Sequence, residues 1–288
     1  MLLVEFVEQV WRPRCMRLRE CTRVGYESAW NRHIAPRWAD TDMGDITPDA
    51  IEDWLWDFDK PGAARKAWAV LRSILRLAVR KGCLDTDPTR REITMPPQPR
   101  CGAPVLDANE VRRLLRGFWG HELEAWLLCA VCAGLRREEA CGLEWSDIDL
   151  RRGVIHIRRA LQWVGGHEVV APPKTDLSSS DVQLPRFAVK RLGELKHGKT
   201  GRIIGDLTPP QVARRYQAWC KRERLPYVPP KSLRHTWGTL AIKSGVDISV
   251  VARQLRHTDI KTTARYYLKP DMSILRDAQR SFEKLIIG

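Results

Sequence analysis

A proline-rich stretch in the first half of the chain limits how the chain can fold. Residues 85–105 contain five prolines and no periodic apolar pattern. Because proline fixes its own φ and disfavours helix in the residue before it, we expect an extended linker here. The chain has 288 residues, which exceeds the usual size of one domain. We therefore expect two domains, residues 1–84 and 106–288.

The N-terminal domain carries apolar residues at helical spacing and should be a small helical bundle. Thr47 is a suitable N-cap, and Pro48 occupies the first helical position after it. Gly82 is a suitable C-cap for the last helix. The predicted helices are residues 2–11 ending near Pro13, a helix from Thr22 to before Pro36, a helix from Thr47 to before Pro61, and Ala63–Lys81.

The charge of the chain favours a polyanionic partner such as nucleic acid. The formal net charge is +14, and the sequence pI is about 9.7. Residues 1–100 carry 17 basic and 15 acidic side chains, so +12 of the +14 belongs to the rest of the chain. The predicted helix 63–81 nevertheless has basic side chains off its apolar face. They are either simply solvated or contact DNA phosphates, and the candidates are Arg65, Lys66, Arg72 and Arg76.

Other features exclude membrane, secreted and metal-binding classes. No apolar run approaches the roughly 20 residues that span a bilayer, and the N-terminus lacks the pattern of a signal peptide, so we expect a soluble cytoplasmic protein. The eight cysteines are scattered, without the paired spacings of a zinc site. Cys129 and Cys132 form a CxxC inside an apolar helical run, where buried, reduced packing residues are expected rather than redox chemistry.

The C-terminal domain begins with two predicted helices. Asp107 and Glu110 have the spacing of a capping box, and a long apolar helix is predicted over residues 121–133. Gly134 ends that helix, and Arg136 follows at the start of the next one, where the helix dipole disfavours a cation. Such a cation usually has an anionic partner. Glu139 is the candidate, and an internal ion pair with no further role is the alternative to a functional site.

A small antiparallel sheet should follow. Its predicted strands are residues 153–164, 168–171 and 181–184, with Gly165 and Gly166 at the first turn. Lys174 lies between the second and third strands, in a loop of turn-forming residues, and by itself would be an ordinary exposed lysine. Helices are predicted next over residues 186–198 and 208–223. The fold class is therefore mainly α with a small antiparallel sheet, α+β.

The remaining motifs lie near the C-terminus. The stretch KSLRHTWGTL contains Lys231, Arg234 and His235, and the stretch VARQLRHTDIKTTARYYL contains His257 and a tyrosine pair. Tyr266 and Tyr267 could be core and surface partners on one helix.

Together these segments resemble the tyrosine recombinases of the phage integrase family. The stretch CAGLRREEACGLEWSDIDL resembles the first arginine box of that family, which assigns Arg136 as its catalytic arginine and Glu139 as its supporting acid. Arg234 and His235 match the second box. Leu255, Arg256 and His257 resemble the third, and Tyr266 falls nine positions after His257, where the family has its nucleophile.

The resemblance implies a role for each matched residue. Arg136 and Arg234 would stabilise charge on the phosphate, because guanidinium groups can bind its non-bridging oxygens bidentately. Tyr266 would attack the phosphorus, and Lys174, on the family's β-hairpin, would protonate the leaving 5′ oxygen. Lys231 and His257 would hydrogen-bond the phosphate and handle protons. This chemistry needs no metal and no ATP, so no cofactor is expected.

Two positions depart from the family pattern. Lys231 stands where the family usually has histidine, and Arg256 stands where it usually has glycine. A lysine can hydrogen-bond a phosphoryl oxygen but is a poor general base unless its pKa is depressed.

The implied architecture is a core-type DNA-binding domain over residues 1–84, a linker over 85–105 and a catalytic domain over 106–288 with a C-terminal helix. We expect no further arm-binding domain in front.

The implied function is site-specific recombination of double-stranded DNA through a 3′-phosphotyrosine, by a bacterial or phage-encoded, nucleoid-associated protein. Tetramers on paired sites and accessory DNA-bending or directionality factors are the expected partners. The final helix either covers its own core or docks on a neighbouring protomer. A monomeric DNA-relaxing enzyme and a catalytically silent DNA-binding relative are the alternatives.

Overall fold

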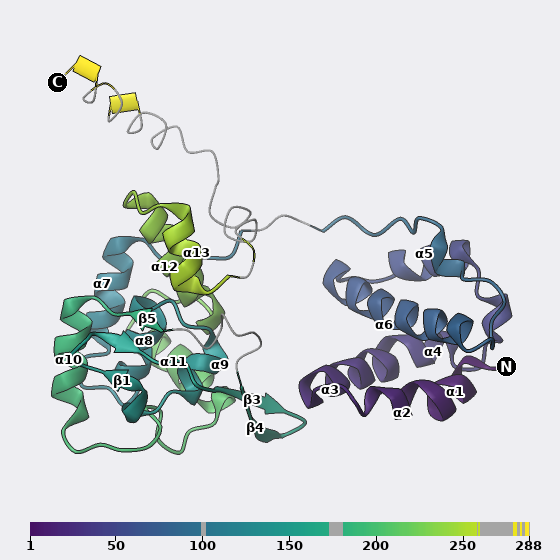
Figure 1. Ribbon diagram of the computed structural model, residues 1–288, viewed down its shortest axis with the longest axis horizontal. Helices are drawn as coiled ribbons and strands as arrows, with labels where there is room; N and C mark the ends of the chain where they lie inside the picture. Colours follow the sequence, from purple (N-terminus) through teal and green to yellow (C-terminus); the bar gives the residue numbers. More distant parts are fainter. Residues whose placement is uncertain are drawn as a thin grey trace. The chain divides into compact units, whose positions relative to one another are not determined.

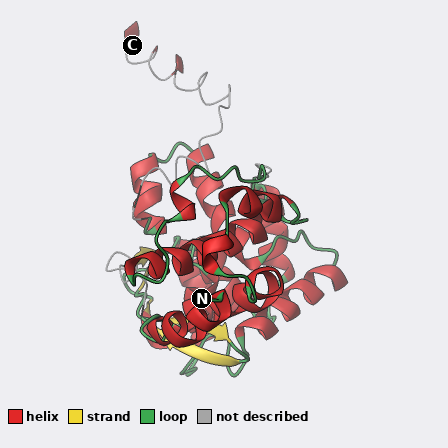
Figure 2. Ribbon diagram, turned by 90° about the vertical axis from the view of Figure 1, so that its right-hand side faces the viewer, coloured by secondary structure: helices red, strands yellow, loops and turns green. Residues whose placement is uncertain are grey.

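The chain forms two compact units. A computed structural model describes residues 1–98, 102–172, 181–257 and 259, together with 279–280, 283 and 286–287. The first unit is Met1–Cys101 and the second is Gly102–Gly288 (Figure 1). Helices dominate the described residues, and the named strands belong to the second unit (Figure 2). The predicted fold class, mainly α with a small amount of antiparallel sheet, is confirmed.

Helical stretches make up the first unit, and four of them were predicted. Buried aromatic side chains such as Trp11, Trp30 and Trp38 pack with the apolar face of the longest helix to form its core. The elements are α1 (Leu3–Phe6), η1 (Val7–Trp11), α2 (Arg12–Cys15), α3 (Glu20–Ala29), η2 (Trp30–Ile34), α4 (Ala35–Trp38), the 3₁₀ turn η3 (Met43–Asp45), α5 (Pro48–Trp56), α6 (Pro61–Arg80) and the 3₁₀ turn η4 (Pro88–Arg90).

The first two helices are longer than predicted, because two prolines do not end them. Each proline is preceded by a five-residue π-helical turn, η1 before Pro13 and η2 before Pro36. A proline inside an α-helix lacks an N–H and clashes with the carbonyl four residues back. A π turn shifts the hydrogen bonds to i→i+5 and changes that local geometry, so the helix continues past the proline. The second helix also begins at Glu20, before the predicted cap Thr22.

Helices α5 and α6 agree with their sequence signals. The Thr47 hydroxyl accepts a hydrogen bond from the Ala50 N–H at 3.2 Å, which confirms the predicted cap of α5. Helix α6 buries the apolar stripe that includes Val70, Leu71 and Ile74. After η4, residues 91–98 and 102–107 form neither helix nor strand.

A fully buried helix lies at the centre of the second unit. All nine residues of α8 are buried, and α7, α9, α10 and α12 pack against it. The capping box of Asp107 and Glu110 at the start of α7 is confirmed by two reciprocal hydrogen bonds of 2.8 Å. The helices are α7 (Ala108–Gly117), α8 (Glu124–Cys132), α9 (Arg137–Gly142), the 3₁₀ turn η5 (Trp145–Asp147), α10 (Arg186–Lys196), α11 (Pro209–Arg222), α12 (Pro230–Lys243) and α13 (Ile248–Leu255).

The strands form two small sheets among the described residues, not the single predicted one. The predicted strand over residues 153–164 is divided into two short strands that join different sheets, and Ile148–Asp149 adds a strand that was not predicted. One antiparallel sheet has the order β1 (Ile148–Asp149), β2 (Val154–Ile155), β5 (Val182–Gln183), and the other is a hairpin of β3 (Ala160–Val164) and β4 (His167–Ala171).

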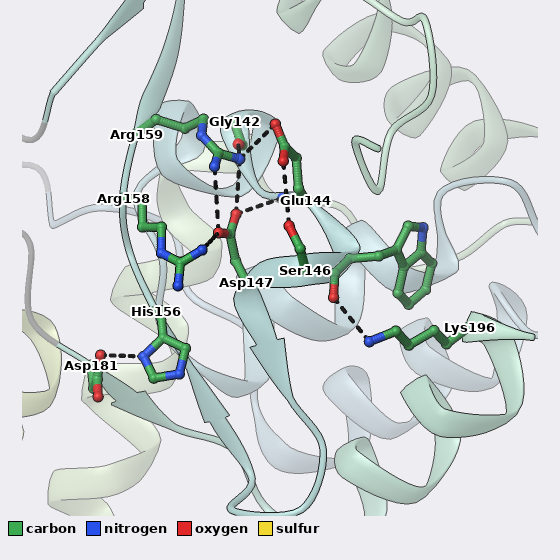
Figure 3. A network of polar contacts seen from close by, with 10 residues as sticks. Gly142, Glu144, Ser146, Asp147, His156, Arg158, Arg159, Asp181 and Lys196 are labelled. Carbon is green, nitrogen blue, oxygen red and sulfur yellow. Dashed lines mark hydrogen bonds and ion pairs between the residues drawn. The ribbon is translucent and has the colours of Figure 1, made fainter. Parts of the chain in front are cut away.

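A buried carboxylate explains why the long strand is interrupted. Asp147, which is 1% exposed, accepts hydrogen bonds from Arg158 at 3.3 Å and from Arg159 at 3.0 Å (Figure 3). Both arginines lie between β2 and β3, so their ion pairs turn the chain away from the first sheet. The side chain of His156 contacts Asp181 at 2.7 Å and joins β2 to the start of β5 (Figure 3).

The described residues contain neither a membrane-spanning helix nor a cluster of metal-ligating side chains. No described helix is long and apolar enough to cross a membrane. No group of three His, Cys, Asp or Glu side chains in that part of the chain could hold a metal ion.

Candidate active site

A glycine break after the central helix begins the site. Gly134 follows α8 with φ of +64°, in the left-handed region that favours glycine. A Cβ at Gly134 would lie 2.8 Å from the Leu255 Cδ2 atom and 3.3 Å from the Trp237 ring. The end of α8, the face of α12 and the end of α13 therefore meet at a point that has no room for a side chain.

Arg136 forms the start of α9 together with the acid predicted to support it. Its backbone N–H donates to Glu139 Oε2 at 2.8 Å, and its Nη1 donates to Glu139 Oε1 at 2.7 Å. The predicted ion pair is thus present. It is not fully internal, because the Arg136 side chain is 36% exposed whereas that of Glu139 is 4% exposed. The side chain of Arg136 is therefore accessible from solvent, as a residue that binds an anion must be.

Arg234 lies on α12 and is buried. Its Nη1 donates to the carbonyl oxygen of Gly134 at 2.8 Å, and its Nη2 donates to the carbonyl oxygen of Leu255. Arg136 Nη2 donates to the carbonyl oxygen of Arg256, the residue after Leu255, at 3.2 Å. Two arginines that are distant in sequence are thereby brought to the same turn at the end of α13.

Arg256 takes part in this cluster, which the sequence did not predict. It is 2% exposed, and its Nη2 donates to Glu139 Oε2, so Glu139 lies between two guanidinium groups. Burial alone would raise the pKa of Glu139, but the charges of Arg256 and Arg136 and the hydrogen bonds from Arg136 outweigh it, and the pKa lies below the ordinary value. Glu139 is therefore ionised at neutral pH.

Two histidines lie beside the arginines. Burial and the nearby charge of Arg234 lower the pKa of His257 to about 4, with smaller contributions from Arg136 and His235. Burial and the charge of Lys231 also lower the pKa of His235. Both imidazoles are therefore neutral near pH 7. Lys231 itself is exposed on the first turn of α12.

The described residues thus bring together most of the predicted site. Arg136, Glu139, Arg234, His235 and His257 form one cluster around the turn after α13. Lys174 and Tyr266, the predicted acid and nucleophile, lie outside the described residues. What the cluster offers chemically is a partly exposed cation, a buried cation and a neutral imidazole, which suits an anionic group with delocalised negative charge.

The four basic candidates of the N-terminal unit lie on α6. Three of them, Arg65, Lys66 and Arg76, are exposed. Arg65 donates to the carbonyl oxygen of Pro96 at 3.3 Å, and Arg76 pairs with Asp87 at 3.7 Å. Arg72 is half-buried, and its guanidinium lies 6.0 Å from the centre of the Trp68 ring.

Comparison with known sequences identifies a family match. The sequence model of the phage integrase family matches residues 104–273, which is more than half of the chain. A relative described as a putative prophage phiRv2 integrase, from Mycobacterium tuberculosis, is 26% identical over 276 residues, covering 86% of this chain and 70% of the relative.

Solved structures share the fold at low sequence identity. The Tn1549 transposon integrase in complex with a circular intermediate DNA matches with a TM-score of 0.83 and 15% identity, covering 98% of this chain and 99% of that one. A lambda integrase tetramer bound to a Holliday junction matches with a TM-score of 0.68 and 18% identity, covering 93% of this chain and 77% of that one. At these identities the likeness concerns the fold.

Proposed function

Because this chain belongs to the phage integrase family and is a site-specific DNA recombinase, we propose that Arg136 and Arg234 bind the scissile phosphate and that Tyr266 attacks it. The observation that carries the proposal is the convergence of both arginines on the turn at Leu255 and Arg256, directly before His257. The integrase relatives favour this function over a monomeric DNA-relaxing enzyme or a catalytically silent relative.

The reaction proceeds by exchange of one phosphodiester bond for another. The Tyr266 hydroxyl oxygen forms a bond to phosphorus, and the bond from phosphorus to the 5′ oxygen breaks, leaving a 3′-phosphotyrosine and a free 5′ hydroxyl. Negative charge that grows on the non-bridging oxygens is stabilised by the two guanidinium groups. The reverse attack by a 5′ hydroxyl rejoins a strand, so neither ATP nor a metal is needed for the bond changes.

A neutral imidazole and a protonated lysine move the protons. His257, whose pKa of about 4 keeps it neutral at pH 7, is able to accept the phenolic proton of Tyr266 or to donate its own N–H to a phosphate oxygen. Lys174 gives a proton to the leaving 5′ oxygen. Lys231 and His235 hydrogen-bond the phosphate and its neighbours, with Lys231 in the position where the family usually has histidine.

Each part of the chain has a role in holding double-stranded DNA. Residues 1–84 act as a core-type DNA-binding domain, residues 85–105 as a linker and residues 106–288 as the catalytic domain with a C-terminal helix. The basic side chains Arg65, Lys66, Arg72 and Arg76 of α6 contact the DNA backbone, supported by the exposure of three of them. The excess of +12 charge beyond residue 100 supports DNA binding by the catalytic domain as well.

Recombination between two sites requires more than one protomer. We expect tetramers on paired sites, by analogy with the lambda integrase tetramer bound to a Holliday junction. Accessory factors would bend the DNA or set the direction of recombination. Truncation after Lys269 should abolish paired-site complexes in a gel-shift assay while leaving single-site binding. Paired-site complexes formed by the truncated protein would contradict a role of the C-terminal segment in assembly.

A nicked suicide substrate tests the proposed nucleophile. The substrate is a duplex carrying the DNA junction that flanks the gene, nicked beside the cleavage point so that the released 5′ hydroxyl is lost. Wild type should accumulate a covalent protein–DNA product on a denaturing gel. Tyr266→Phe should form none, and Tyr267→Phe, the matched control one position away, should form it as wild type does. Absence of any covalent product with wild type would contradict the proposed mechanism.

A further inference from the structure

An arginine occupies a backbone position that is unfavourable for it. Arg256 has φ of +54° and lies directly after α13, in the left-handed region where glycine is the usual residue. Its side chain has 0% exposure, and its Nε atom has no hydrogen-bond partner among the described residues. A strained backbone and an unsatisfied buried N–H both cost stability, and such costs are typical of residues that serve a function.

Arg256 donates one hydrogen bond to the carbonyl oxygen of Gln254, at 3.4 Å, and forms an ion pair with one carboxylate. Its Nη2 donates to Glu139 Oε2, the oxygen that also accepts the backbone N–H of Arg136. The other oxygen, Oε1, accepts from Arg136 Nη1 at 2.7 Å. Both oxygens are therefore occupied, so Glu139 is fixed in one orientation, and it fixes the guanidinium of Arg136 in turn.

The charges in this cluster do not cancel. Arg136 and Glu139 alone would form a neutral pair, and the attraction of Arg136 for a phosphate would be weakened accordingly. Together the side chains of Arg136, Glu139 and Arg256 hold two cations and one anion, a net charge of +1. The Arg256 side chain is fully buried, whereas that of Arg136 is 36% exposed. Arg136 is therefore the cation of this group that solvent can reach.

We propose that Arg256 is a positioning residue for DNA cleavage, acting through Glu139 to orient Arg136 and to keep its positive charge available to the scissile phosphate. This inference rests on the proposed role of Arg136. Arg256 does not touch DNA itself, since no atom of its side chain reaches the surface. Its effect should therefore appear in the rate of cleavage, where charge on the phosphate increases, more than in the affinity for DNA.

Arg256→Gly removes the side chain and retains the backbone. The carbonyl oxygen that accepts the hydrogen bond of Arg136 Nη2 remains, and glycine tolerates the positive φ. We expect single-turnover formation of the covalent product on the nicked substrate to slow at least tenfold, while the Kd for the same duplex changes less than threefold. Arg256→Met, which keeps the volume but not the charge, should slow cleavage similarly, and Arg256→Lys should recover to within about threefold of wild type.

The chain offers a matched control. In the described part of the chain, Arg224 is the other non-glycine residue with positive φ, at +50°, and it is exposed. Arg224→Gly removes the same charge and the same kind of backbone strain at a residue outside the group of Arg136, Glu139 and Arg256, so its cleavage rate should equal that of wild type. A comparable loss of cleavage rate in Arg224→Gly would mean that the effect of Arg256→Gly comes from the overall charge of the protein and not from the contact with Glu139.

A double-mutant cycle tests whether Arg256 acts through Glu139. Glu139→Gln removes the shared anion, so adding Arg256→Gly to it should slow cleavage by less than threefold further. Full additivity of the two losses would overturn the proposal, as would wild-type cleavage by Arg256→Gly with only a lowered Tm. If Arg256→Gly does not fold, Arg256→Met decides, and wild-type cleavage by Arg256→Met overturns the proposal. Failure of the proposed function is distinct from these outcomes, because wild type itself would then form no covalent product.

Discussion

The guanidinium groups of Arg136 and Arg234 donate hydrogen bonds to the carbonyl oxygens of two consecutive residues, Arg256 and Leu255 respectively. The turn that ends α13 is therefore a shared acceptor for side chains from α9 and α12. A guanidinium has five N–H donors, so the hydrogen bond to this turn uses one donor of each arginine. Changes that displace the turn should disturb both arginines together.

Gly134→Ala should destabilise the protein through that turn. A Cβ at Gly134 would lie 2.8 Å from Leu255 Cδ2, and the positive φ is unfavourable for alanine. We expect the free energy of unfolding to fall by about 1–2 kcal/mol from backbone strain and by a further 1–3 kcal/mol, roughly, from overpacking. Urea denaturation measures both contributions together.

Gly120→Ala is the matched control for that substitution. Gly120 also has positive φ, at +78°, but a Cβ there meets no atom within 4 Å among the described residues. The loss of stability in Gly120→Ala should be limited to the backbone strain, and its cleavage rate should equal that of wild type. Equal losses in the two variants would show that the contact with Leu255 has no energetic effect.

Lys231→His restores the residue usual in the family. Lys231 is exposed one turn before His235 on α12, and its charge contributes to the lowered pKa of His235. Histidine can also donate a hydrogen bond to a phosphoryl oxygen, so we expect the cleavage rate to stay within about tenfold of wild type, or roughly 1.4 kcal/mol. Lys231→Ala, which has no donor, should lose more. Complete inactivation of Lys231→His in the single-turnover assay would mean that lysine has a role histidine cannot fill.

His257 should make folding stability fall in mild acid. Its pKa is about 4 in the folded protein, and an unfolded histidine has a pKa of about 6.5. Between these values the unfolded state binds more protons, so this contribution to stability is lost as the pH falls from about 6.5 toward about 4. Denaturation of His257→Asn should show a weaker pH dependence over that window and the same dependence as wild type above pH 7.5. An unchanged slope would contradict the lowered pKa.

The buried cysteines should be inert in the folded protein. Burial raises the pKa of the Cys132 thiol to about 12 and raises that of Cys129 further. Iodoacetamide at pH 8 should modify the exposed Cys83 and leave Cys129 and Cys132 unmodified, as read by peptide mass spectrometry. In urea all three should react. Rapid modification of the CxxC pair in native protein would contradict their structural role.

Local chemistry in the sequence was sufficient to predict several helices. The capping residues Thr47 and Asp107 act within three residues of themselves, so a short segment contains all that determines the start of α5 and α7. Prolines were less reliable as signals of where a helix ends. Pro13 and Pro36 indicated helix ends, but a π turn before each one lets the helix continue. Both π turns bury side chains in the core of this unit, and no local sequence pattern indicates them.

The site could be predicted only in part. Arg136 and Glu139 are three residues apart, so their pairing is a local matter, whereas the convergence of Arg136 with Arg234 was expected from the family resemblance and not from spacing. Arg256 was recognised as a departure from glycine, but its burial was missed, because its partner Glu139 is 117 positions away. Glu139, an acid expected beside the catalytic arginines, is the signal that could have suggested a second cationic partner such as Arg256.

The π turns have a consequence for how the N-terminal unit tolerates insertions and deletions. Each π turn is equivalent to one extra residue placed inside an α-helix. The five residues of a π turn advance around the helix axis by about the same angle as four α-helical residues, roughly 400°. Deleting one residue within Val7–Trp11 should therefore restore α-helical hydrogen bonding and leave the two ends of the helix in nearly the same relative rotation. Leu3 and Phe6 on one side and Cys15 on the other are all buried in the same core, and both groups would stay buried after such a deletion. Among homologous chains, a loss of one residue should therefore be tolerated within Val7–Trp11, whereas a loss elsewhere in the same helix, where no π turn can absorb it, should rotate one buried group out of the core.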